Sequence, residues 1–213
     1  MSKVIAIAGE SGSGKTTAMR NLNSTETYYI DCDRKGLPWK GWREQYNREN
    51  KNYIAIYQPQ KIIKIIENIN NEAPHIKYIV IDTINGIMVG DEYDRRNEKT
   101  YDKWADLAWS VWELMDKAYS YRDDLTLIFI AHTQTERDES GYQFTRIKTS
   151  GKKLDKIALE SKLTTVLIAK SVSGKYLFET KSNNSTCKTP MGAFDVDTID
   201  NDITIVIKAL EEY

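Results

Sequence analysis

Nine residues near the start of the chain combine glycines, a lysine and hydroxyl groups at a spacing that suits phosphate chemistry. After the apolar run 4–8, the sequence matches G-x-x-x-x-G-K-[ST] and continues with one more threonine. Glycines let the backbone wrap around a polyphosphate, so that several N–H groups and the positive end of a following helix face the anion. A Gly/Ser-rich surface turn is the alternative, but it would not require the flanking strand and helix patterns. We therefore predict a site for a nucleoside triphosphate, ATP, at Gly9, Glu10, Ser11, Gly12, Ser13, Gly14, Lys15, Thr16 and Thr17.

Two side chains of this loop have individual predicted roles. Lys15 reaches the β- and γ-phosphates in such a loop, which makes it a candidate catalytic residue. The Thr16 hydroxyl is placed to hold Mg²⁺. A second magnesium ligand is predicted at Asp82, which closes the apolar run 78–81 in the manner of a Walker B element. The alternative for Asp82 is an acid that only forms a turn.

Polar groups also follow two other apolar runs, at 31–33 and 132–133. Ligands of open α/β sheets lie outside the carboxyl ends of the strands, so one sheet would bring these groups to the γ-phosphate. Asp33 is a candidate base that orients and deprotonates the attacking water, or else it belongs to the turn into 34–36. His132 is a candidate sensor of the γ-phosphate, or else an ordinary loop histidine.

The bulk composition indicates a soluble globular protein. Of 213 residues, 29% are charged and the net charge is −1, which favours one domain over 1–213 and argues against a wholly basic nucleic-acid binder. Cys32 and Cys187 form no CxxC pair, so we expect a reducing cytoplasm and neither a disulfide framework nor a zinc site. No run approaches the roughly 20 apolar residues of a membrane helix, and no signal peptide precedes the first strand. We expect a cytoplasmic protein with no membrane partner.

Apolar runs alternate with helical patterns along most of the chain. Strands are predicted near 4–8, 28–32, 53–57, 78–82 and 126–131, and helices at 16–22, from Pro59 through Ile69, and at about 101–121. This alternation predicts an α/β fold with a mainly parallel sheet between helices. The tail differs, with a helix at 152–162 and strands near 164–169, 175–180 and 203–208, some of them antiparallel.

The predicted helix 101–121 has an apolar stripe suited to a buried face, formed by Trp104, Leu107, Ala108, Val111, Met115 and Ala118. Core packing is therefore preferred over ligand stacking for Trp104 and Met115. Trp109 and Trp112 fall partly off the stripe, and a subunit contact is one possible role for them.

With these residues in order, the chain resembles the RecA-like ATPase core of the P-loop NTPases. More narrowly, it resembles short phage-encoded nucleotide-binding proteins, including the Sak-type single-strand annealing proteins. The resemblance runs from Val4 to about Phe178 and is carried by the phosphate loop and the segments 29–33, 78–83 and 127–132. It implies a catalytic base at Asp33 and a polar sensor at His132, at the head of a DNA-binding loop. It also implies that the sensor strand lies between the phosphate-loop and Walker B strands.

Two features depart from that family. Asp33 is one methylene shorter than the usual glutamate, so the water must approach more closely or hydrolysis is slow. The chain starts at the first strand, without the N-terminal segment through which RecA-type recombinases polymerise. The expected homo-oligomer is therefore left open between a ring, a filament and a different subunit contact.

A basic segment follows His132 after a polar stretch at 133–141 that we expect to be a mobile loop. Residues 142–156 carry five cations and one acid, a net charge of +4, with aromatic residues between them. Such a segment suits single-stranded DNA, although a solvated charged face is the alternative. The predicted DNA contacts are Arg146, Lys148, Lys152 and Lys153, with a weaker candidate pair at Arg95 and Arg96. Lys181 matches cations that reach a neighbouring subunit's phosphates in RecA-like enzymes, or else it is an ordinary strand-end lysine.

The leading hypothesis is a magnesium-dependent ATPase of the RecA-like class that acts on single-stranded DNA in phage recombination or replication, in the host cytoplasm. Single-strand-binding or replication proteins are its expected partners. One competitor is a small-molecule kinase for nucleotides or nucleosides, which would need an acceptor pocket. The other is a switch that binds ATP and recruits a partner with negligible turnover.

Overall fold

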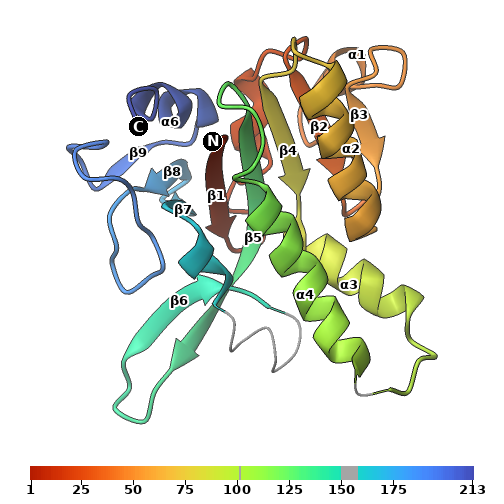
Figure 1. Cartoon of the computed structure of the whole chain (residues 1–213). Helices are drawn as coiled ribbons and strands as arrows, with labels where there is room; N and C mark the ends of the chain where they lie inside the picture. The colour runs from red at the N-terminus through yellow and green to blue at the C-terminus, as the bar shows by residue number, and fades with distance from the viewer. Residues whose placement is uncertain (101, 150–157) are drawn as a thin grey trace.

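A twisted, mainly parallel sheet forms the centre of the molecule (Figure 1). The computed structural model describes residues 1–100, 102–149 and 158–213. Over these residues the sheet has the order β3-β2-β4-β5-β1-β7-β8-β9, with β6 paired to β5 beyond this path. The strands are β1 (Lys3–Gly9), β2 (Thr27–Asp31), β3 (Tyr53–Ala55), β4 (Tyr78–Asp82), β5 (Thr126–Arg137), β6 (Gln143–Ile147), β7 (Thr165–Val172), β8 (Lys175–Glu179) and β9 (Thr198–Asp200).

The strands from β3 to β7 are parallel, and only the additions are antiparallel. β1 pairs in parallel with both β5 and β7, and β2 pairs in parallel with β3 and β4. β6, β8 and β9 are antiparallel to their neighbours. The predicted α/β class with a partly antiparallel C-terminal extension is therefore confirmed. The implied strand order is confirmed as well, because β5 lies between β1 and β4.

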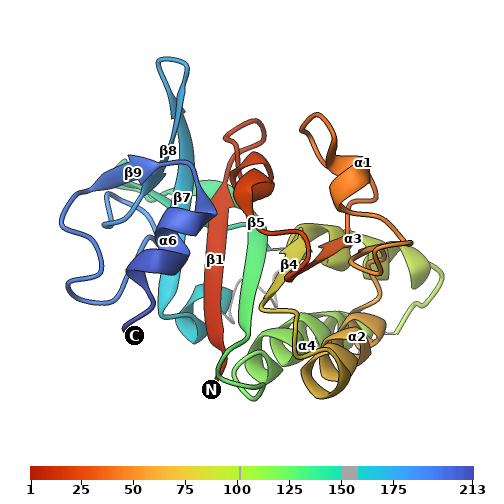
Figure 2. The same ribbon diagram turned by 90° about the horizontal axis from the view of Figure 1, so that it is seen from above.

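Helices cover both faces of this sheet. On one face lie α2 (Pro59–Glu72), α3 (Ile84–Asp94) and α4 (Asp102–Lys117), and on the other lie the 3-10 helix η1 (Thr17–Asn21) and α6 (Ile203–Ala209). Figure 2 shows α2 and α4 side by side, with α6 well separated from them beside β1. Alternate residues of β1 enter the two cores, since Val4, Ala6 and Ala8 face the first and Ile5 and Ile7 the second.

The two long helices bury the stripes that their sequences predict. Pro59 occupies the first turn of α2, and Ile62, Ile66 and Ile69 are buried on one side of it. In α4 the predicted stripe is confirmed at Leu107, Ala108, Val111 and Met115, and Ala118, directly after the helix, is buried as well. Trp109 is 57% exposed and meets Trp112 edge to face at 5.7 Å, so it lies off the stripe as expected.

Some predicted elements were wrong. The predicted strand 203–208 is the helix α6, in which Asp202 caps the first turn by accepting a hydrogen bond from Thr204 N at 2.9 Å. Its β-branched residues suggest a strand, but Ile203, Val206 and Leu210 recur at helical spacing and are buried together. The predicted helix 16–22 forms only the short η1. Of the predicted helix 152–162, the described part contains the 3-10 helix η2 (Leu159–Lys162), and the rest lies outside the described residues.

Two helices were missed: α3 and the one-turn α1 (Trp42–Gln45). The missed α3 has a usable signal, because Thr83 caps it by accepting from Gly86 N at 3.0 Å, and Ile84, Ile87 and Met88 follow at helical spacing.

The segment after His132 differs most from its prediction as a mobile loop. β5 continues to Arg137 and forms a hairpin with β6 that projects beyond the carboxyl end of the sheet (Figure 1). The turn is closed by Asp138, whose Oδ1 accepts from Ser140 N and Tyr142 N at 2.9 Å each, and by Gly141 at φ +88°. His132 therefore lies within a continuous strand and not at the head of a loop.

Among the helices of the described ranges, none combines the length and apolar character that crossing a bilayer requires.

Candidate nucleotide site

The phosphate loop follows β1 and has a backbone that only glycines permit at its key positions. Gly12 and Gly14 have φ values of +78° and +90°, in the left-handed region. A Cβ atom on Gly9 would lie 2.5 Å from Ser13 Oγ and 2.6 Å from the Ala169 carbonyl oxygen, so a side chain has no room there. The conformation is therefore set by the three glycines of the motif.

Lys15 is folded onto the carbonyl groups of its own loop. Its Nζ donates to the carbonyl oxygens of Gly9 and Glu10 at 2.9 Å and 2.6 Å, respectively. Lys15 as a whole is only 5% exposed. Burial lowers the pKa of Lys15 to about 8, although the nearby Asp82 and Asp33 carboxylates act in the opposite direction. A phosphate oxygen with a full negative charge would hold this ammonium more strongly than two neutral carbonyls do.

Asp82 ends β4 next to Thr16 and is almost completely buried. Its Oδ2 accepts from Tyr29 Oη at 2.7 Å, whereas its Oδ1 has no hydrogen-bond partner among the described residues. Burial raises the pKa of Asp82, and the Tyr29 and Thr16 hydroxyls lower it in part. Burying a carboxylate oxygen without a hydrogen-bond partner lowers the stability of the fold, unless a ligand or an ion contacts that oxygen. Together with the Thr16 hydroxyl it is a donor set that fits hydrated Mg²⁺.

Asp33 follows β2 and is held by groups of the neighbouring elements. Lys35 Nζ donates to its Oδ2 at 2.6 Å, and Thr83 Oγ1 donates to its Oδ1 at 3.1 Å. A Cβ atom on Gly86 would lie 2.4 Å from Asp33 Oδ1, so the carboxylate packs closely against the start of α3. The structure thus places Asp33 beside Thr83, and each of its oxygens accepts one of these hydrogen bonds and has a further lone pair for a water.

His132 is brought to the phosphate loop by the strand register. It lies opposite Gly9 in the β1–β5 pairing, and Asn85 Oδ1 of α3 accepts from its backbone N at 2.7 Å. Partial burial lowers the pKa of His132, and the positive charge of Lys15 lowers it further. The imidazole is therefore neutral at pH 7 and has one donor and one acceptor nitrogen.

Lys15 and His132 share one groove, whereas Asp33 lines the adjoining cavity that His132 also lines. A cavity of about 430 Å³ runs past the loop and is lined by Lys15, Thr16, Thr17, Lys35, Thr83, His132 and Tyr176, with Asp82 buried behind Thr16. It has the size of a ligand site. The structure thus brings Lys15, Thr16, Asp82, Asp33 and His132 together, as the order of strands predicted.

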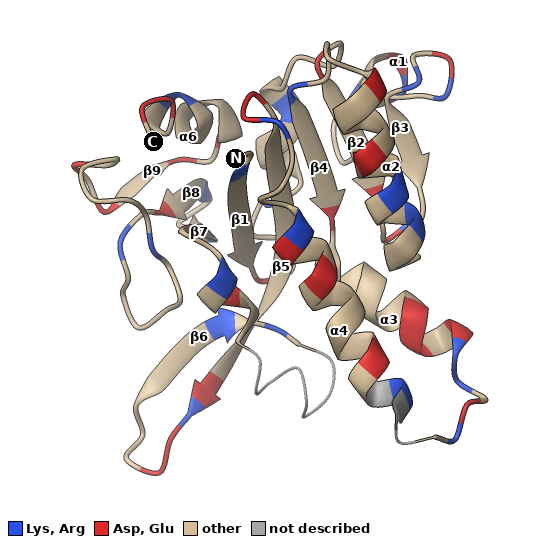
Figure 3. Ribbon diagram, viewed as in Figure 1, with Lys and Arg blue, Asp and Glu red and all other residues tan. Residues whose placement is uncertain are grey.

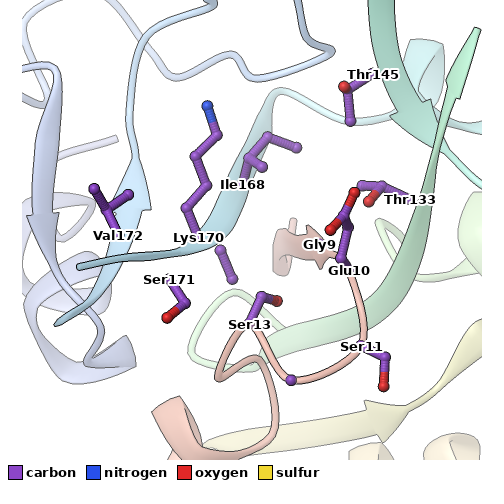
Figure 4. Close-up of a pocket in the computed structure, with 12 residues that line it drawn as sticks. Gly9, Glu10, Ser11, Ser13, Thr133, Thr145, Ile168, Lys170, Ser171 and Val172 are labelled. Atoms are coloured by element: carbon purple, nitrogen blue, oxygen red, sulfur yellow. The ribbon is translucent and has the colours of Figure 1, made fainter. Parts of the chain in front are cut away.

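A second cavity, of about 330 Å³, lies on another side of the same loop (Figure 4). Its walls come from Gly9, Ser13, Thr133, Thr145 and Ile168. The Lys170 side chain at its edge extends away from the loop and forms an ion pair with Glu179. We assign the nucleotide to the first cavity, because only that one is lined by Lys15 and Thr16.

Three contributors to the site were not predicted. Tyr29 fixes the Asp82 carboxylate, and Asn85 fixes His132. Tyr176 of β8 lies over the loop, since a Cβ atom on Gly14 would come within 2.9 Å of its ring. The helical spacing of apolar residues over 84–88 would have predicted that Asn85 lies in the first turn of a helix shortly after Asp82. No local pattern identifies Tyr29 or Tyr176, because their contacts with the loop and Asp82 arise from strand pairing.

The predicted DNA contacts are mostly engaged within the chain. Arg146 lies 3.5 Å from Glu136 and 3.6 Å from Glu160, and its side chain is only 16% exposed. Arg95 pairs with Glu98 and Asp106 at 2.8 Å and 3.1 Å. The Arg96 guanidinium lies over the Tyr93 ring at 4.4 Å. Arg146 and Arg95 would therefore have to exchange these carboxylates for a phosphate in order to bind DNA, whereas Arg96 is exposed.

Among the remaining predicted cations, Lys148 is exposed, and Lys152 and Lys153 lie outside the described residues. Lys181 contacts the Asp195 carbonyl oxygen and the Asp197 carboxylate, each at 3.2 Å, and it does not line the groove. In the view of Figure 3, Lys and Arg alternate with Asp and Glu along α2, α4 and the β5–β6 hairpin.

Comparison with known proteins agrees with this geometry. A family model described as an AAA domain matches residues 1–190. A search of curated proteins gives no significant match to the chain.

Proposed function

This chain belongs to the AAA-domain family of P-loop ATPases, and on that premise we propose that it is a magnesium-dependent ATPase coupled to single-stranded DNA. The observation that supports this proposal most strongly is the buried Asp82 carboxylate beside Thr16 and close to Lys15, whose Oδ1 has no hydrogen-bond partner within the described ranges. The setting is phage recombination or replication, as the resemblance to Sak-type proteins implies.

Catalysis in this proposal is mainly positioning and charge neutralisation. The loop N–H groups and Lys15 would bind the β- and γ-phosphates, and Thr16 and Asp82 would hold Mg²⁺. When bound, the metal ion neutralises charge on the phosphate oxygens. Asp33, oriented by its contacts with Thr83 and Lys35, accepts a hydrogen bond from the attacking water and then a proton from it. His132 donates a hydrogen bond to the γ-phosphate from the strand that leads into the β5–β6 hairpin.

The DNA partner is supported by features around that hairpin. Lys148 is exposed just after β6, and the segment 142–156 has an excess of positive charge. A strand that contains the sensor and continues into the hairpin can transmit a change at the phosphate to a bound polyanion. We propose that the protein assembles as a homo-oligomer in which Lys181 reaches a neighbouring subunit, and that it works with a single-strand-binding or replication protein.

ATP hydrolysis, measured with and without single-stranded DNA at two salt concentrations, tests this function. We expect stimulation by DNA that weakens as salt rises, because phosphate contacts release counterions.

Lys15→Ala should abolish nucleotide binding or turnover, and unchanged hydrolysis by this variant would refute the site. Asp33→Asn should bind ATP but lose turnover by roughly 100-fold or more, and a rate equal to that of the wild type would place the base elsewhere.

The same assay separates the two competing functions. A rate of ATP turnover that DNA does not change, together with a phosphorylated product when a nucleotide or nucleoside is added, would indicate a kinase. Tight ATP binding with negligible turnover under every condition would indicate a recruiting switch.

A further inference from the structure

A third ligand-sized cavity adjoins the nucleotide groove at His132. It has a volume of about 420 Å³ and opens between α3, the end of β2 and the end of β6. We call it the α3 pocket and define it by Arg34, Tyr57, Val89, Gly90, His132 and Lys148. Because His132 lines both cavities, a ligand in the α3 pocket would lie next to the predicted position of the γ-phosphate.

One wall of the α3 pocket is a flat stack. The Tyr57 ring lies directly on Gly90, where a Cβ atom would come within 2.3 Å of it. The Arg34 guanidinium covers the ring at 4.3 Å, and Tyr57 Oη is fixed by Asp94 at 2.8 Å. Val89 is 60% exposed at the edge of the pocket. A guanidinium plane backed by an aromatic ring is a surface on which nucleobases stack.

The polar side of the pocket is cationic. Within the described residues, neither Arg34 nor Lys148 forms an ion pair, and the acid that lines the pocket, Asp33, is paired with Lys35. Asn85 fixes the position of this side, because its Nδ2 donates to the Lys148 carbonyl oxygen at 2.8 Å while its Oδ1 accepts from His132 N. A rigid pocket with two unpaired cations favours an anion, and phosphate suits both of them.

We propose that the α3 pocket binds one nucleotide unit, with its base against the Arg34–Tyr57 stack and its phosphate on Lys148. The unit is either a free mononucleotide or part of a single strand, since both present the same base and phosphate. Binding itself does not depend on ATP. A bound nucleotide unit would also change the rate of ATP hydrolysis, because it would contact His132 and Asp33. Only this second effect rests on the proposed function.

Binding is measured first without ATP, by calorimetry with dAMP and with a short deoxyadenosine oligomer. Arg34→Asn keeps a residue that tolerates the left-handed backbone at this position, where φ is +58°. Val89→Glu adds a negative charge at an exposed side chain. Each of these variants, and Lys148→Ala, should weaken binding by about tenfold, the scale of one lost stacking or phosphate contact. The matched controls Arg48→Ala and Lys64→Ala remove exposed cations away from the pocket and should bind normally.

The outcomes separate the sources of the ligand and the two proposals. Equal pocket-dependent binding of dAMP and the oligomer identifies a free nucleotide, whereas binding of the oligomer alone identifies a strand. Failure of both probes to bind, or binding that Arg34→Asn and Val89→Glu leave unchanged, overturns the inference. Pocket-dependent binding by a protein that never hydrolyses ATP would support the inference and refute the ATPase proposal.

Discussion

Single residues of the site are held in states that a bound triphosphate would change. The Lys15 ammonium donates to two carbonyl groups, and one oxygen of Asp82 has no hydrogen-bond partner in the part of the chain that the structure describes. Both groups are buried and both have shifted pKa values. The unliganded loop therefore has charges that the triphosphate and the metal ion would satisfy, which makes binding sensitive to pH and to magnesium.

The pKa of Lys15 gives a pH prediction with a defined sign. Below pH 8 the free protein already has a charged Lys15, and above it the amine must take up a proton when the triphosphate binds. Nucleotide affinity should therefore fall by about fivefold from pH 8 to pH 9, because the protonated fraction of Lys15 falls from about one half to about one eleventh. Calorimetry in buffers of different ionisation enthalpy should show about half a proton taken up per site at pH 8. Affinity that stays constant over this interval would contradict the buried position of Lys15.

Folding has a different pH dependence at this residue. The folded chain disfavours a charged Lys15, so this group costs stability below pH 8. The cost disappears as pH rises from 8 toward the ordinary pKa of lysine, 10.5. Lys15→Met should remove the pH dependence of both folding and binding that comes from this side chain.

Asp82 gives a prediction about magnesium. Asp82→Asn retains an acceptor for Tyr29 but removes the charge, so the magnesium concentration that gives half-maximal turnover should rise by about 10-fold to 100-fold. Asp31→Asn is the matched control, because Asp31 lies opposite Asp82 in the register and binds Tyr53 Oη and Gly36 N instead. An equal magnesium response in both variants would rule out Asp82 as a metal ligand.

At the scale of elements, α3 connects the Walker B strand to the β5–β6 hairpin. It begins at Ile84, two residues after Asp82, and Asn85 in its first turn bonds to His132 of β5 and to Lys148, the residue after β6. Thr83 joins the same helix to Asp33. A shift of α3 on metal or phosphate binding would therefore move the hairpin and one wall of the α3 pocket.

Asn85→Asp tests this connection. The substitution keeps the acceptor for His132 N but replaces the donor to the Lys148 carbonyl with a carboxylate, at a cost of about 1–3 kcal/mol. We expect the amides of His132 and Lys148 to exchange hydrogen roughly 5-fold to 150-fold faster. Gln134→Ala on the same hairpin removes only a contact with Glu136 and should leave those amides protected. Unchanged exchange in Asn85→Asp would mean that the hairpin is held by strand pairing alone.

At the scale of the whole molecule, both hydrophobic cores share one sheet. β1 contributes to each core, and it leads directly into the phosphate loop. The chain should therefore unfold as one unit, in keeping with a single domain over 1–213. A site built on the central strand also makes ligand binding stabilise the whole fold.

Scanning calorimetry checks this expectation. We predict one transition, which a non-hydrolysable ATP analogue with magnesium at about 100 times its Kd raises by roughly 5–10 °C. Lys15→Ala should unfold in one transition that the ligand does not move. Two separate transitions in the wild type, with only one of them sensitive to the ligand, would show that the C-terminal strands form an independent unit.

The sequence by itself determined the features that depend on local chemistry. The phosphate loop, the closing Asp82, the apolar stripes of α2 and α4 and the α/β class all follow from residue type and spacing over short distances. The resemblance to RecA-like proteins added the position of the sensor strand, which the pairing of β5 with β1 and β4 confirms.

Only the tertiary structure decided which distant groups meet. Tyr29 reaches Asp82 because β2 and β4 are neighbours, and Tyr176 reaches Gly14 because β8 folds back along β7. The polar stretch after His132 is a strand because β6 satisfies its backbone, and 203–208 is a helix because its buried residues face η1. Arg146 and Arg95 look available in the sequence, but folding brings acids to both. Contacts between residues far apart in the chain depend on register and packing, which local residue patterns do not encode.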